Sequence, residues 1–356
     1  MLGSRAGRWA LRGRAGQQAA WTSRHLSSKY EDLVEGVKAG KRLAIAKTIS
    51  LLESSRGEDR TAVEGVFAEL LRSTSADRSL RIGVSGPPGV GKSTIIEALG
   101  MHVVEDMKEK LAVLAVDPSS TRTGGSILGD KTRMSALAQH PRSFIRPSPS
   151  RGVLGGVARG THASIRVMEA AGYNNILVET VGVGQSEIEV EDMVDVFLLL
   201  LPPGGGDELQ GIKKGVVEVA DIVAITKADG DLLSAALRAK TEYKNALTLF
   251  RKKHRDWAPK VMVTSSRTGE GIPELWQTIQ GFVNDMHASG ELQERRERQA
   301  LNWMWRIVDG ALIDRVKNDK AVKAAMPGLV EDVKAGRMLP GAASDEILRQ
   351  FFGNHF

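Results

Sequence analysis

One glycine-rich stretch, residues 86–93, limits the possible folds of this chain more than any other feature. It follows the apolar run 80–85 and precedes the helical pattern 94–99, so it lies between an expected strand and an expected helix. Its residues match the pattern G-x-x-x-x-G-K-[ST], in which backbone amides and the positive end of a new helix hold a phosphate. We therefore expect a nucleoside triphosphate here, with Lys92 reaching its β- and γ-phosphates and Ser93 holding Mg²⁺.

The alternative is a glycine-rich turn that matches the pattern by chance, and the strand and helix on its two sides weigh against it. Glycines in the turn let backbone amides crowd around an anion. The expected nucleotide contacts in this stretch are Gly86, Pro87, Pro88, Gly89, Val90, Gly91, Lys92, Ser93 and Thr94.

The pattern from Leu80 onward alternates strands and helices, which predicts an α/β fold with a largely parallel sheet covered on both faces. The expected strands are 80–85, 112–116, 175–179, 194–201, 221–226 and 260–264. The expected helices are 92–107, 161–171, 208–219, 230–253 and 272–288. The segment 120–160 is rich in Gly, Ser, Arg and Pro, and we expect it to be a long functional loop.

Helical segments flank the expected P-loop domain, which we place at 77–289. Residues 29–76 have apolar positions at helical spacing and predict an N-terminal helical cap, with breaks at Gly36 and Gly40 and a third helix over 60–71. Residues 290–356 predict a C-terminal helical arm, with helices over 291–318, 320–336 and 343–352. Because this arm is too small to hold a large core, we favour dimerisation as its role over an intramolecular cap.

The net charge of +6 lies in the first 30 residues, which hold Arg5, Arg8, Arg12, Arg14, Arg24 and Lys29 and no acid. The remainder therefore sums to about zero, and we expect no nucleic-acid partner. Residues 1–28 have the Arg-rich, acid-free composition of a mitochondrial transit peptide, which predicts the mitochondrial matrix; a disordered tail is the alternative. No apolar run approaches the roughly 20 residues of a membrane helix, so we expect no membrane span.

Acidic residues at strand ends are the candidates for metal binding and catalysis. Asp117 ends the second expected strand, and Glu179 ends the next, where many P-loop GTPases carry DxxG; Gly182 would sense the γ-phosphate. Asp130 lies in the long segment and is a further candidate for the metal or its waters. Gln185 would orient the attacking water, or is an exposed switch residue. The candidate catalytic residues are Lys92, Asp117, Glu179 and Gln185, and the candidate metal ligands are Ser93, Asp117, Asp130 and Glu179.

A guanine-reading pattern follows the strand 221–226. The motif NKxD is expected there, and the chain has Thr226, Lys227 and Asp229 in its positions. Asp229 would accept hydrogen bonds from N1–H and the N2 amino group of guanine, which adenine lacks, while the stem of Lys227 packs on the base. Thr226 replaces the asparagine, so we expect weaker base binding. Ser265 and Ser266, after the last strand, fit a loop that closes over the guanine.

Residues 202–214 join a strand to a helix and combine glycines with charges. Glycines permit movement, and such a loop reports the state of the nucleotide to a partner. The alternative is a plain connecting loop.

The glutamate at the third motif is typical of the metallochaperone-like branch of P-loop GTPases, and within it the chain resembles the MeaB and methylmalonic aciduria type A protein family. The resemblance covers about residues 29–356, and its most specific strings are 33–37, 116–120, 124–134, 146–152 and 179–185. It implies a homodimeric, GTP-dependent chaperone that gates adenosylcobalamin loading and protects or reactivates methylmalonyl-CoA mutase. It also implies that the phosphate and Mg²⁺ site is formed by Lys92, Ser93, Asp117, Asp130 and Glu179.

The sequence therefore favours a mitochondrial GTPase that uses GTP/GDP and Mg²⁺ and serves a cobalamin-dependent mutase. A nickel metallochaperone GTPase is the first alternative; the absence of cysteine and the scatter of the seven histidines weigh against it. A small-molecule kinase is the second alternative, and no acceptor-site residues stand out for it.

Overall fold

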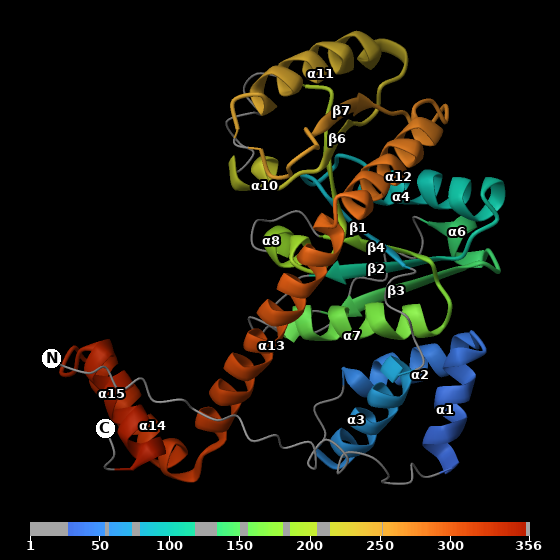
Figure 1. Ribbon diagram of the computed structural model, residues 1–356. Coiled ribbons are helices and arrows are strands. Elements are labelled where there is room, and N and C mark those ends of the chain that lie inside the picture. The colour runs from blue at the N-terminus through green and yellow to red at the C-terminus, as the bar shows by residue number, and fades with distance from the viewer. Residues whose placement is uncertain are drawn as a thin grey trace, which may run out of the picture.

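The computed structural model describes residues 28–53, 57–72, 79–117, 134–149, 156–180, 186–204, 214–250 and 252–353 (Figure 1). Its core is a seven-stranded, parallel sheet in the order β3-β2-β4-β1-β5-β6-β7. The strands are β1 (Leu80–Ser85), β2 (Leu111–Asp117), β3 (Ser143–Pro149), β4 (Asn175–Glu179), β5 (Val196–Leu201), β6 (Ile222–Ile225) and β7 (Lys260–Val263). The predicted α/β fold with a largely parallel sheet is confirmed.

Helices cover both faces of this sheet, as the uninterrupted apolar strands require. Every residue of β4, β5 and β6 is buried. One face packs against α7 (Gly156–Ala170) and α11 (Leu233–Leu247), and the other against α4 (Lys92–Met101), α6 (Ser135–Gln139) and α12 (Ile272–Ala288). The shorter elements are α8 (Ser186–Glu191), α10 (Lys214–Glu218), the π-helix η3 (His102–Asp106) and the 3₁₀-helix η4 (Gly230–Leu232).

The expected long loop over 120–160 is wrong for its second half, because α6 and β3 lie there. β3 pairs in parallel with β2 at the edge of the sheet, with Ala115 opposite Pro147 and Asp117 opposite Pro149. Proline lacks the N–H that a central strand must donate, but an edge strand tolerates it. The two prolines made this segment look like a loop in the sequence.

The N-terminal helices α1 (Ser28–Lys38), α2 (Arg42–Leu52) and α3 (Gly57–Arg72) pack against α7. As expected, the helical pattern is interrupted at Gly40, which lies between α1 and α2 and has a φ of +68°. The helix break expected at Gly36 is wrong, because Gly36 lies inside α1. A Cβ atom at Gly36 would come within 2.7 Å of the Cβ of Ala44, so the glycine allows α1 and α2 to approach closely.

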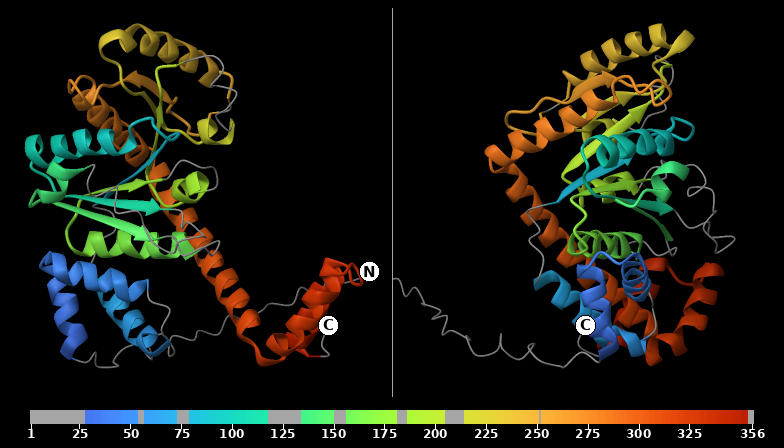
Figure 2. Two further views of the ribbon diagram at one scale, coloured as in Figure 1. Left: turned by 180° about the vertical axis from the view of Figure 1, so that it is seen from behind. Right: turned by 90° about the vertical axis from the view of Figure 1, so that its right-hand side faces the viewer.

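The C-terminal helices are α13 (Glu291–Asn318), α14 (Lys320–Lys334) and α15 (Pro340–Phe352). The first half of α13 runs along the edge of the sheet where the strands begin, and the second half projects from the body and carries α14 and α15 away from it (Figures 1 and 2). α14 packs against α13 and α15. None of the described helices is both long and apolar enough to cross a membrane.

Ion pairs fix the first half of α13 at the edge where the strands begin. The guanidinium of Arg296 binds the buried carboxylate of Asp195 at 2.7 Å, and that of Arg295 binds Glu191 at 3.0 Å. Gln299 donates to the carbonyl of Val194 at 2.9 Å. The helix is therefore attached to the end of α8 and to the loop that enters β5.

Candidate functional site

The turn after β1 has the geometry of a phosphate-binding loop. Gly91, which precedes α4, has a φ of +97°, and Gly86 has a φ of +158°. A Cβ atom at Gly86 would lie 2.5 Å from the carbonyl oxygen of Leu200, so only glycine fits there. The Nζ of Lys92 donates to the carbonyl of Gly86 at 2.7 Å and to that of Pro87 at 3.1 Å. The loop, the start of α4 and this ammonium together form a site for an anion.

The first turn of α4 meets the end of β4. The hydroxyl of Ser93 donates to Oε1 of Glu179 at 3.2 Å, and both side chains are buried. Glu179 lies in register with Val84 on β1 and Ala115 on β2, so β4 holds its carboxylate beside the phosphate loop.

These two oxygen donors fit Mg²⁺, a hard cation that prefers hydroxyl, carboxylate and water oxygens. Among the residues that the structure describes, no group of three or more His, Asp or Glu side chains is placed to hold a metal ion. Mg²⁺ usually keeps several waters and takes one or two protein oxygens together with the phosphates, so Ser93 and Glu179 suit that mode of binding.

Several predicted site residues lie partly or wholly outside the described part of the chain. Asp117 ends β2, which runs beside β4, so it lies at the same edge of the sheet as Glu179. The side chain of Asp117 is outside the described residues, as are Asp130, Gly182 and Gln185. Their roles stay predictions.

The loop after β6 lies against the phosphate loop. Thr226 is 1% exposed, and its hydroxyl donates to the carbonyl of Val90 at 2.7 Å. Lys227 has a φ of +55°, unusual for a residue other than glycine, and its Nζ donates to the carbonyl of Gly89 at 2.8 Å. The expected guanine-reading residues therefore also bind the loop expected to hold the phosphates.

The loops after β6 and β7 meet at Asp229. The hydroxyl of Ser265, which is fully buried, donates to Oδ2 of Asp229 at 2.5 Å. The backbone joins the same two loops, because the amide of Ala228 donates to the carbonyl of Thr264 at 3.1 Å. Ser266 is half-buried next to Ser265. These bonds join the two loops and orient the carboxylate of Asp229; that Asp229, Ser265 and Ser266 bind guanine stays a prediction.

One buried contact at this edge was not predicted from the sequence. The hydroxyl of Thr180 donates to that of Ser85 at 2.9 Å, and both side chains are almost fully buried. The contact ties the end of β4 to the end of β1, directly beside Glu179 and the phosphate loop. The signal available in the sequence was a hydroxyl residue at each strand end: Ser85 is the last residue of β1, and Thr180 directly follows β4.

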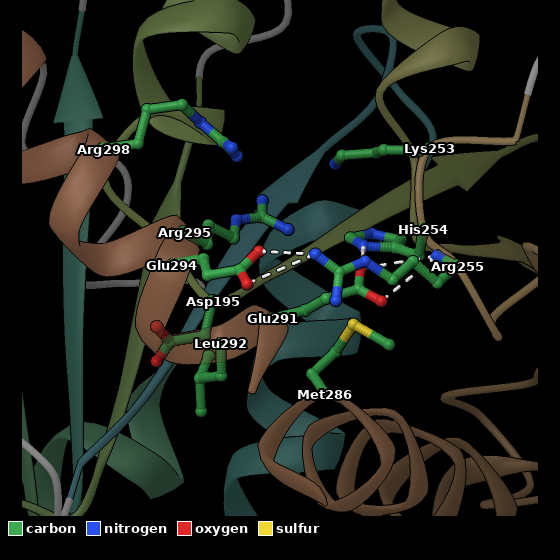
Figure 3. A pocket seen from close by; sticks show the side chains of 10 residues that line it. All are labelled: Asp195, Lys253, His254, Arg255, Met286, Glu291, Leu292, Glu294, Arg295 and Arg298. Carbon is green, nitrogen blue, oxygen red and sulfur yellow. Dashed lines mark hydrogen bonds and ion pairs between the residues drawn. The ribbon is translucent and has the colours of Figure 1, made fainter. Parts of the chain in front are cut away.

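A cavity of about 210 Å³ lies at the opposite edge of the sheet, between α13 and the segment that enters β7 (Figure 3). Charged side chains of both signs line it, and Arg255 binds Glu294 across it at 3.0 Å. Two of its cations are already paired, since Lys253 and Arg295 each bind Glu191 at 3.0 Å. The cavity therefore belongs to the ion-pair cluster that holds α13.

The centre of that cluster is Asp221, which is fully buried. Burial alone would raise the pKa of Asp221, but the charges of Arg295 and Lys253 and a hydrogen bond from His254 outweigh it and hold the pKa well below its ordinary value. Lys253 Nζ and His254 Nε2 lie 2.9 and 2.8 Å from Oδ1 of Asp221. Asp221 is thus a structural carboxylate rather than a proton donor.

Comparisons with known proteins match almost the whole chain. The model of the family described as "Methylmalonyl Co-A mutase-associated GTPase MeaB" matches residues 45–321. The mouse protein named methylmalonic aciduria type A homolog, mitochondrial, is 45% identical over 93% of this chain and 82% of its own length. A probable GTPase of Mycobacterium bovis is 45% identical over 93% of this chain and 97% of its own. Among solved structures, one described as an LAO/AO transport system kinase superposes with a TM-score of 0.71 and 32% identity, over 91% of this chain and 97% of its own.

Proposed function

The chain belongs to the family of methylmalonyl-CoA mutase-associated GTPases, and on that premise we propose that it is a GTP-hydrolysing chaperone of methylmalonyl-CoA mutase. In this proposal its nucleotide cycle gates the loading of adenosylcobalamin and protects or reactivates the mutase. One observation carries the proposal furthest: at one edge of the sheet the phosphate loop meets both Glu179, which accepts from Ser93, and the loop that carries Asp229, whose Lys227 donates to Gly89.

The residues at this edge suit phosphoryl transfer from GTP to water, which depends mainly on positioning and charge neutralisation. Lys92 neutralises charge on the β- and γ-phosphates. Ser93 and Glu179 would hold Mg²⁺ or its waters, with Asp117 and Asp130 as further candidate ligands, and the ion would supply positive charge that neutralises the phosphates. The carboxylate of Glu179 also orients the attacking water, with Gln185 as a second candidate.

Guanine selectivity comes from Asp229 in this proposal. Its carboxylate accepts from N1–H and the N2 amino group of the base, and adenine presents no such pair of donors. The hydroxyl of Ser265 supports this role, because it holds Oδ2 of Asp229 at 2.5 Å and so fixes the direction of the carboxylate. Lys227 packs its stem on the base, and Ser266 lies in the same closing loop.

The attachment of α13 supports a link between nucleotide state and the C-terminal helices. α8 follows the strand that ends at Glu179, and the residues at its end bind α13. Glu191 accepts from Arg295 at 3.0 Å, and Asp192 accepts from Arg306 at 2.5 Å. A shift of α8 on hydrolysis would therefore move α13. The loop 202–214 is a second route by which we propose that a partner reads the nucleotide.

We propose that the C-terminal helices form a homodimer with a second copy of this chain. Leu301, Trp305, Val308 and Leu312 recur at spacings of four, three and four, which places them on one face of α13. Leu301 is 60% exposed and Trp305 61% exposed, so no part of the chain that the structure describes covers these side chains. α13 projects from the body, and an identical α13 offers a matching apolar stripe. Trp305→Glu should convert the dimer to a monomer in sedimentation equilibrium, and an unchanged mass would contradict the dimer.

We also propose a mitochondrial location, in the matrix, with residues 1–28 as the transit peptide. The composition of that segment supports it, and so does the name of the mouse relative, which describes that protein as mitochondrial. The division into 29–76, 77–289 and 290–356 is part of the same proposal.

Co-purification with methylmalonyl-CoA mutase tests the function. We expect the full chain to retain the mutase, and to retain different amounts when GTP or GDP is supplied. Lys110→Ala, at the opposite edge of the sheet, serves as a control for a surface-charge effect. Failure to retain the mutase both with GTP and with GDP would contradict the proposal.

A further inference from the structure

The Thr226 hydroxyl faces the phosphate loop. Its Oγ1 lies 2.7 Å from the carbonyl oxygen of Val90 and 3.3 Å from that of Leu201. A hydroxyl carries a single proton, and the shorter distance assigns it to Val90. The carbonyl of Leu201 already accepts the backbone amide of Thr226 at 2.9 Å, so it does not need the hydroxyl.

Burial separates this hydroxyl from a base. Thr226 is 1% exposed and Val90, whose carbonyl it binds, is also 1% exposed. Asp229, which directly follows Ala228, has a carboxylate that is only half-buried. The loop after β6 therefore turns the side chain of Thr226 toward the phosphate loop and leaves that of Asp229 partly exposed.

The neighbouring residue strengthens the same contact. Lys227 donates to the carbonyl of Gly89 at 2.8 Å, so consecutive residues of the β6 loop bind consecutive carbonyls of the phosphate loop. Both bonds lie directly before Gly91 and the start of α4. Fixing the carbonyls of Gly89 and Val90 also fixes the two peptide planes that these carbonyls share with the amides of Val90 and Gly91, of which the amide of Val90 donates to the carbonyl of Pro87 at 3.4 Å.

We propose that Thr226 is a positioning residue for phosphate binding and does not contact the guanine base. This inference rests on the proposed GTP site. It replaces the expectation that threonine at this position weakens base recognition: base recognition depends on Asp229, and the threonine hydroxyl holds the phosphate loop in its binding conformation.

The test compares ligands that share the base and differ in phosphate. Thr226→Val removes the hydroxyl at nearly constant volume and leaves the buried carbonyl of Val90 without this donor. We expect the Kd for GDP to rise about tenfold, the usual scale of such a loss. The inhibition constant of guanosine, measured by competition with a fluorescent GDP, should stay within about twofold. Thr226→Ser, which keeps the hydroxyl, should restore GDP binding.

The matched control is Thr48→Val, which makes the same change at a threonine that is 2% exposed on α2, away from this edge of the sheet. It should leave both ligands unaffected. If Thr226→Val does not fold, as judged by circular dichroism, Thr226→Ala and Thr226→Ser provide the same comparison.

Two results would overturn the inference alone: an equal loss of guanosine and GDP binding, which indicates a base ligand, or unchanged GDP binding in the folded variant. A wild-type chain that binds neither GDP nor GTP would overturn the proposed function and this inference with it.

Discussion

The hydroxyl of Ser93 lies 3.2 Å from Oε1 of Glu179, and these two residues are 8% and 7% exposed. This contact joins the first turn of α4 to the end of β4, so the phosphate loop and the strand-end carboxylate form one site. These two buried oxygens would suit Mg²⁺, which takes hydroxyl and carboxylate oxygens as ligands.

Glu179→Gln should lower the rate of GTP hydrolysis about 100-fold, within the range for loss of a group that positions or activates the attacking water. The amide keeps the size of the side chain and the contact with Ser93 but loses the negative charge. GDP affinity should change little. Single-turnover hydrolysis at saturating Mg²⁺ measures the effect. Glu97→Gln, on the same helix as Ser93, should retain the wild-type rate, and a wild-type rate in Glu179→Gln would exclude the assigned role.

Asp229→Asn should exchange the preference for guanine for a preference for xanthine. The carboxylate accepts two hydrogen bonds from guanine, whereas an amide presents a donor that matches the second carbonyl of xanthine. Competition binding with GDP and xanthosine diphosphate checks the exchange. We expect the Kd for GDP to rise, and that for the xanthine nucleotide to fall, by at least about tenfold. A variant that loses affinity equally for both bases would show that Asp229 supports the loop and does not read the base.

The buried side chain of His162 should make the free energy of unfolding depend on pH. Burial lowers the pKa of His162 to about 4, assisted by Arg81 and Arg166 and opposed by Glu169. As the pH falls, the unfolded chain takes up the proton near its ordinary pKa of about 6.5, before the folded chain does. The contribution of neutral His162 to the stability of the fold is therefore complete above pH 6.5 and is lost as the pH falls toward 4.

Urea unfolding of His162→Phe checks this assignment. The substitution keeps an aromatic ring stacked on Trp303, whose ring lies 4.8 Å from that of His162. Between pH 7 and 4.5 the wild type should lose about 2 kcal/mol more than the variant. Parallel pH profiles would show that His162 is not the responsible group.

Asp221→Asn should destabilise the fold by about 3 kcal/mol, because it leaves buried cations without their counter-charge. Arg295 and Lys253 lie 3.4 and 2.9 Å from the carboxylate of Asp221. Glu294→Gln is the control, because its ion pair with Arg255 is exposed and is worth less than about 1 kcal/mol. Equal unfolding free energies for the two variants would show that Asp221 is not the counter-charge on which the buried cations depend.

The sequence was most informative where one local pattern decides the structure. The loop 86–93, the apolar strands and Gly40 each carry their own signal, and the structure places them as expected. β3 was missed because Pro147 and Pro149 contradict a strand unless it is known to lie at an edge. The contact of Thr226 with Val90 and the pairs that hold α13 join residues far apart in the chain, so local periodicity does not reveal them.

The most direct test of the account is steady-state GTP hydrolysis by the full chain, alone and with methylmalonyl-CoA mutase. We predict slow hydrolysis alone, clear acceleration by the mutase, and loss of both rates in Lys92→Ala with an unchanged circular dichroism spectrum. Equal turnover with and without the mutase, or retained hydrolysis in Lys92→Ala, would contradict the account.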